Sequence, residues 1–164
     1  MSKKPTASQG NGELMELALK DLARSGLDKK DFKTLKLQVL DRHETDAFVG
    51  EPRASYKIPY FDVNGKEISY SRVRFLETGK SKPFSKGTRE GSFRYSQPFN
   101  SSPHIYFPPY LDWKKIAKNP EFPVLITEGE KKAALACKMG LACFALGGVY
   151  GYKASKRLQD LIPE

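Results

Sequence analysis

The strongest chemical signal in this sequence is residues 127–133 (TEGEKKA), which follow a short apolar run. Such a run predicts a buried parallel strand, and open α/β sheets bind ligands at the carboxyl ends of their strands. Glu128 is therefore a candidate metal ligand or general acid/base for phosphoryl chemistry. Gly129 permits close approach of a phosphate. The amides at the helix start, with Lys131 and Lys132 beside them, would attract anions.

The same segment has a plainer interpretation. Acidic residues at a helix N-terminus stabilise the helix through its dipole by about 0.3–1 kcal/mol, and lysines are commonly solvated. The segment is not a P-loop, because the pattern of Gly, four residues, Gly-Lys and Ser or Thr is absent from it. Both interpretations remain open at this point.

A second pattern interleaves basic and aromatic side chains in the middle of the chain. In a strand over residues 68–75, alternation places Tyr70, Arg72 and Arg74 on one face, which would present two guanidinium groups beside a ring. Residues 79–100 mix cations and rings, which suits single-stranded nucleic acid. The candidate nucleic-acid-binding residues are Tyr70, Arg72, Arg74, Lys82, Arg89 and Arg94. The alternative is a surface loop anchored by its aromatic residues.

Charge and composition agree with a polyanionic partner. The 28 Lys and Arg against 19 Asp and Glu give a net charge of +9, which favours association with nucleic acid. An anionic membrane fits less well, because no basic amphipathic helix stands out. No apolar stretch approaches the roughly 20 residues of a membrane span, and the two cysteines lack zinc-site spacing. We therefore expect a cytoplasmic protein with no membrane partner.

The elements that would position these residues fall into three parts. Residues 1–12 read as a disordered tail, and residues 13–118 as helices followed by a β-rich region that binds nucleic acid. Ser25–Gly26 ends the first helix, and Asp28 caps a second short one. A short strand is predicted at 37–40, and Asn64-Gly65 predicts a hairpin between strands at 56–61 and 68–75. Pro59 favours an edge position for the first of those two strands.

Residues 119–164 switch to an α/β pattern. Strands are predicted at 123–127 and 142–146, with helices at 131–139 and 153–161. A strand, helix and strand in this order imply a parallel sheet with a right-handed crossover. The expected fold class is α+β or α/β, with small N-terminal helices and a β-rich middle leading into an incomplete parallel unit.

Several motifs in order resemble a bacterial and phage domain of unknown function with a toprim-like core, found in primase- and helicase-type replication proteins of phages and plasmids. The motifs are residues 126–133, 140–141 and 145–150, and upstream 21–27, 56–62 with Gly65, 72–75, and 104–109 with Trp113. In toprim enzymes a glutamate after the first strand is a catalytic acid/base or metal ligand, and a later pair of aspartates binds Mg²⁺. The resemblance puts Glu128 at the glutamate position.

The resemblance implies a truncated toprim-like unit over 119–164 that carries half of a Mg²⁺ site. The aspartate pair would be expected on a strand after Glu164, so we expect this chain alone to be catalytically inactive and to bind Mg²⁺ poorly. The leading hypothesis is the N-terminal portion of a mobile-element DNA replication protein that binds single-stranded DNA. Its partners would be a helicase domain or the rest of the toprim unit. The alternative is a stand-alone non-catalytic nucleic-acid-binding or inhibitory protein-interaction module.

Overall fold

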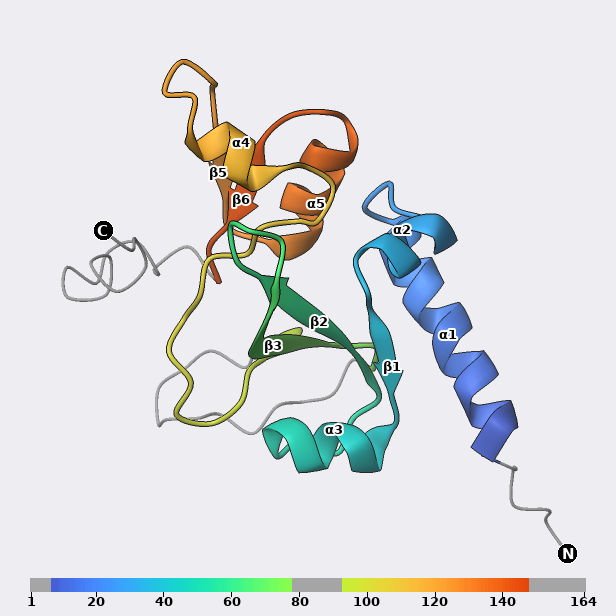
Figure 1. Ribbon diagram of the computed structural model, residues 1–164. Helices are drawn as coiled ribbons and strands as arrows, with labels where there is room; N and C mark the ends of the chain where they lie inside the picture. The colour runs from blue at the N-terminus through green and yellow to red at the C-terminus, as the bar shows by residue number, and fades with distance from the viewer. Residues whose placement is uncertain (1–6, 78–92, 148–164) are drawn as a thin grey trace, which may run out of the picture.

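The computed structural model describes residues 7–77 and 93–147 and has a mixed α+β fold (Figure 1). The expected order of helices, a β-rich middle and a strand–helix–strand unit is confirmed. The elements are α1 (Ala7–Ala23), α2 (Lys29–Thr34), β1 (Gln38–Leu40), α3 (Arg42–Val49), β2 (Ser55–Phe61), β3 (Glu67–Phe75), β4 (Tyr95–Ser96), α4 (Trp113–Ala117), β5 (Leu125–Thr127), α5 (Glu130–Lys138) and β6 (Cys143–Ala145). The helix predicted at 153–161 lies outside the described residues.

The N-terminal helices differ from expectation at two points. Helix α1 begins at Ala7, so residues 7–12 are helical rather than part of a tail. The cap of α2 is confirmed, because the Asp28 side chain accepts hydrogen bonds from the amides of Lys30 and Asp31. Helix α3 was not predicted, although Asp41 and Glu44 form a second capping box at its start. That Asp-x-x-Glu spacing was the available signal.

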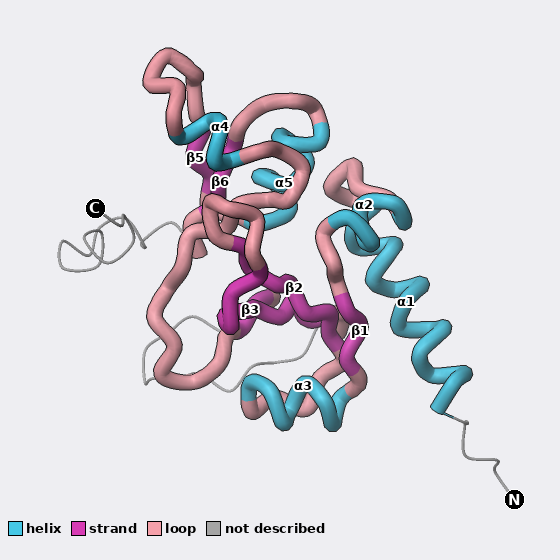
Figure 2. The backbone as a smooth tube through the Cα atoms, in the orientation of Figure 1, coloured by secondary structure: helices cyan, strands magenta, loops and turns pink. Residues whose placement is uncertain are grey.

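The first sheet is antiparallel, in the order β1-β2-β3-β4. The predicted hairpin is confirmed, with Gly65 in the left-handed region at φ +76°. The predicted edge position of the strand that carries Pro59 is wrong, since β2 lies between β1 and β3. Pairing with β1 reaches only Lys57, two residues before Pro59, so the missing amide costs no hydrogen bond to β1. Helices α1 and α3 both contact β1 (Figure 2).

The second sheet consists of β5 and β6, which pair in parallel around α5 as predicted. Their register aligns Leu125 with Cys143 and Thr127 with Ala145. Tyr106 forms an antiparallel bridge to Ala145. The expectation that β5 is buried is wrong, because Leu125 is 50% exposed and Ile126 63% exposed. A strand needs neighbours on its edge and on both faces to be buried, and two strands with one helix do not supply them.

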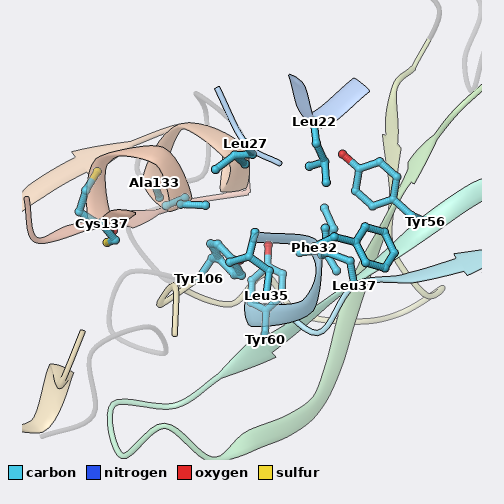
Figure 3. Close-up of a cluster of buried hydrophobic side chains, with 14 of the residues drawn as sticks. Leu22, Leu27, Phe32, Leu35, Leu37, Tyr56, Tyr60, Tyr106, Ala133 and Cys137 are labelled. Atoms are coloured by element: carbon cyan, nitrogen blue, oxygen red, sulfur yellow. The ribbon is translucent and has the colours of Figure 1, made fainter. Parts of the chain in front are cut away.

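One hydrophobic core runs through both sheets and joins the parts on either side of residue 118. Leu22 comes from α1, Leu27 from the connection between α1 and α2, Tyr60 from β2, and Ala133 and Cys137 from α5. These side chains gather in one cluster (Figure 3). Both cysteines are buried free thiols, which agrees with a core role. Across 7–77 and 93–147, no helix combines the length and apolarity that a membrane span requires.

Candidate phosphate-binding site at the end of β5

A hollow of about 340 Å³ opens where β5 ends and α5 begins. The sequence-predicted residues Glu128, Gly129, Lys131 and Lys132 all line it, and so does Arg72 from β3. The remaining lining residues, Ser25, Tyr95 and Glu130, were not predicted as site residues. The expected position of the site, at the carboxyl end of a parallel strand, is therefore also the position of a concave surface.

Glu128 and Lys132 both line the hollow and form an ion pair with i, i+4 spacing across the start of α5. The Glu128 side chain is 49% exposed and that of Lys132 is 66% exposed. The hydrogen bond from Lys132 lowers the pKa of the Glu128 carboxyl, which keeps it ionised near neutral pH. An ionised carboxylate suits a metal ligand or general base better than a general acid.

Gly129 precedes α5 as its N-cap and is not required by the backbone. Its φ of −141° and ψ of 138° are extended values that any residue adopts, and no side chain caps the helix there. A Cβ built on Gly129 would meet nothing within 4 Å. The first amides of α5 therefore face an open approach, in which a ligand backbone or phosphate can come close.

Although Lys131 lines the hollow, its ammonium group is bound to Asp21 rather than to solvent. Its ammonium donates to the carboxylate of Asp21 at 2.9 Å and to the Asp21 carbonyl at 3.1 Å. The same carboxylate accepts two hydrogen bonds from Arg74, at 2.5 and 2.6 Å, and one from Tyr56 at 2.9 Å. Burial alone would raise the pKa of Asp21, but the bonds from Arg74 and Lys131 outweigh it and lower that pKa.

Glu130 forms a second buried ion pair one residue earlier. Its carboxylate is 3% exposed and accepts hydrogen bonds from Tyr60 at 2.7 Å and from Arg72 at 2.6 Å. The Arg72 Nε is buried without a hydrogen-bond partner in the part of the chain that the structure describes. Arg72 also limits the residue at Gly147, where a Cβ would lie 3.2 Å from its Nη1.

These two ion pairs attach the start of α5 to α1 and β3, in the N-terminal part of the chain. Asp21 of α1 fixes Lys131, and Arg72 of β3 fixes Glu130. The Glu128–Gly129 turn directly precedes both anchored residues. Its position is therefore set by contacts across more than 50 residues of sequence rather than by its own loop. Such support fixes the orientation of a site on a short turn.

The expected cationic face of β3 is not exposed. Tyr70 and Arg74 are each 6% exposed, and Tyr70 donates to Gln97 at 2.9 Å. Arg72 and Arg74 are held in ion pairs, because Glu130 of α5 and Asp21 of α1 lie against this face of β3, which the alternation pattern did not reveal. Arg94 is exposed. Lys82 and Arg89 lie outside the described residues.

The carboxylates present do not form a Mg²⁺ site by themselves. Within 7–77 and 93–147, no group of three metal-ligating side chains occurs. Glu128 is the exposed carboxylate of the hollow, while Glu130 is committed to Arg72 and Tyr60. A Mg²⁺ site built on Glu128 therefore remains a prediction for a longer protein.

Comparison with known proteins covers the C-terminal part of the chain. Residues 112–163 match the model of a family described as Domain of unknown function (DUF3854), so the match includes α4, β5, α5 and β6. An uncharacterized protein of Picosynechococcus sp. is 38% identical over 32% of this chain, and the chain spans 6% of that relative. No solved structure matches the chain. The resemblance to a domain of unknown function is thus supported for residues 112–163.

Proposed function

We propose that this chain binds nucleic acid and that the hollow at the end of β5 takes a phosphate group. The observation that carries the proposal is the open start of α5, where uncapped amides, Gly129 and the exposed Lys132 face one concave surface. The net charge of +9 supports a polyanionic ligand. Tyr95 lines the same hollow and offers a ring beside the phosphate position.

We further propose that the chain is the N-terminal portion of a mobile-element replication protein of primase or helicase type. The support is the toprim-like resemblance around Glu128 and the match of a small part of a much longer relative. In such a protein Glu128 would share a Mg²⁺ site with carboxylates from another segment, and a helicase domain would act on the same DNA. The isolated chain would then bind single-stranded DNA without catalysis, and metal-dependent polymerisation or cleavage by it would contradict this.

The test is fluorescence anisotropy with labelled single- and double-stranded DNA over a salt series. We expect single-strand binding that falls steeply with salt, because phosphate contacts release counterions. Lys132→Ala should weaken binding several-fold and reduce the logarithmic salt slope by about 1. Its matched control is Lys20→Ala, which removes an equally exposed lysine that also pairs at i, i+4, with Glu16.

Arg72 and Arg74 are unsuitable for this test, since removing either leaves a buried carboxylate unpaired. Gly129→Ser is a better second variant, because the structure has space for the new side chain. It should fold normally and weaken DNA binding by crowding the approach to the α5 amides. Equal affinities for Lys132→Ala and Lys20→Ala, or no binding at low salt, would contradict the proposal. The alternative function, a stand-alone protein-interaction module, would then be favoured. The exposed apolar side chains of β5 support that alternative.

A further inference from the structure

The outer side of β5 is an apolar surface that nothing in the described structure covers. Nine large hydrophobic residues are exposed within 7–77 and 93–147, and six of them lie between residues 122 and 141. These six are Phe122, Val124, Leu125, Ile126, Met139 and Leu141. Since single exposed apolar residues are common on any surface, the informative feature is the run of four at 122–126, which lie on β5 or directly before it.

The backbone of β5 is also open along that side. Leu125 donates its amide to Ala142 at 2.8 Å, and Thr127 accepts from the Leu146 amide at 2.9 Å. Residues 125 and 127 therefore direct their backbone groups toward β6. Because these groups alternate along a strand, the N–H and C=O of Val124 and Ile126 point away from β6. An edge with unpaired backbone groups and apolar side chains is a template for another strand.

The usual protections of a strand edge are missing here. Residues 122–127 carry no charge in a chain of which 29% of residues are charged. Pro123 has the same orientation as Leu125, so its missing donor faces the β6 side and leaves the outer edge unblocked. On the other side of the sheet, the Tyr106 bridge already occupies β6 at Ala145. Among the residues that the structure describes, the outer edge of β5 is therefore the open side of this sheet.

We propose that β5 pairs with β5 of a second copy of this chain, antiparallel, about a twofold axis at Leu125. Val124 of each copy then faces Ile126 of the other, and both pairs use the backbone groups that point outward. An apolar, uncharged edge is complementary to itself, as an isologous contact requires. The result is a four-stranded sheet, β6-β5-β5-β6, in which the side chains of Val124 and Ile126 from the two copies pack side by side on one face.

The contact involves a short strand, so we expect a concentration-dependent dimer rather than a permanent one. Each copy carries a formal charge of +9, which opposes association at low ionic strength. Salt screens that repulsion and leaves the apolar contact intact, so dimerisation should strengthen as salt rises. DNA binding should change in the opposite direction, so the failure of one proposal is distinguishable from the failure of the other.

Sedimentation velocity of the full chain over two orders of magnitude in concentration tests the proposal. The mass should rise from 18.5 kDa toward twice that value. Ile126→Lys should abolish this rise, and Ile126→Thr should weaken it if the lysine variant folds poorly. Leu17→Lys is the matched control, because it introduces the same charge at another exposed aliphatic residue and should leave the dimer intact.

Two further measurements identify the contact. Leu125→Cys should form an intermolecular disulfide under mild oxidation while Leu17→Cys does not, because only Leu125 meets its own copy across the axis; the native thiols are buried. The amides of Val124 and Ile126 should exchange more slowly as protein concentration rises. A monomer with fast exchange at both amides would overturn the proposal. A monomer with slow exchange would also overturn it, and would assign the edge to another part of the same chain.

Discussion

The two sheets of this chain differ in how completely other elements cover them. In the antiparallel sheet, Tyr56, Ile58 and Tyr60 of β2 are at most 2% exposed, because strands flank β2 on both sides and helices cover it. In the parallel sheet, β5 has one neighbouring strand within 7–77 and 93–147, and its apolar residues are about half exposed. The difference shows that an apolar run becomes a buried strand only when its surroundings contain the layers to bury it.

The largest expected effect concerns the ion pairs of Asp21, which connect α1 to β3 and to α5. Asp21→Asn would leave Arg74 and Lys131 without their carboxylate in a largely buried position, which should cost about 3–5 kcal/mol of unfolding free energy. Urea denaturation measures the loss. Glu16→Gln, which breaks the exposed pair with Lys20, is the control and should cost less than about 1 kcal/mol. Similar losses for both variants would show that the Asp21 network does not stabilise the fold.

Shortening an aliphatic side chain to alanine should cost much more unfolding free energy in the shared core than on β5. Leu22→Ala removes a fully buried side chain from the shared core and should lower the unfolding free energy by about 2–5 kcal/mol. Ile126→Ala on β5 should change it by less than about 0.5 kcal/mol in dilute protein, because the side chain is exposed. A large loss for Ile126→Ala at low concentration would mean that β5 is buried in solution.

Acid should weaken the contacts by which Asp21 and Asp31 anchor α5. The hydrogen bonds and ion pairs of Asp21 and Asp31 outweigh their burial and lower both carboxyl pKa values in the folded state. The unfolded chain therefore binds protons more readily, and stability present above about pH 4 is lost as pH falls through the folded pKa values. Urea midpoints measured from pH 7 to pH 3 should fall. The fall should be shallower in Asp21→Asn. An unchanged dependence of the urea midpoint on pH would show that Asp21 does not contribute to the acid sensitivity.

The smallest expected effect compares two helix starts. Asp41→Ala removes the capping box of α3 and should cost about 0.5–2 kcal/mol. Gly129→Ser supplies a cap that α5 lacks and should raise the unfolding free energy by a few tenths of a kcal/mol. Thermal denaturation should show a lower melting temperature for Asp41→Ala and a slightly higher one for Gly129→Ser. A destabilised Gly129→Ser would indicate that the glycine is needed for folding rather than for the approach of a ligand.

Local patterns in the sequence were sufficient to predict most of the elements. The Asn64-Gly65 hairpin, the Asp28 cap and the β5-α5-β6 unit are encoded by residues close to one another, so short-range propensity and alternation reveal them. The position of Glu128 at the end of a parallel strand followed from the same kind of pattern. Helix α3 was missed although its capping box was visible in the sequence.

Tertiary structure alone decided what the charged side chains do. Alternation correctly placed Arg72 and Arg74 on one face of β3, yet no local pattern indicated that Glu130 and Asp21 would meet them there, 58 and 53 positions away. The same long-range contacts separate Lys131, which is bound to Asp21, from its neighbour Lys132, which is exposed. The sequence by itself determined most of the elements and placed the candidate site at the end of β5. Burial and ion pairing were decided by the packing of distant segments, because they depend on which surfaces meet.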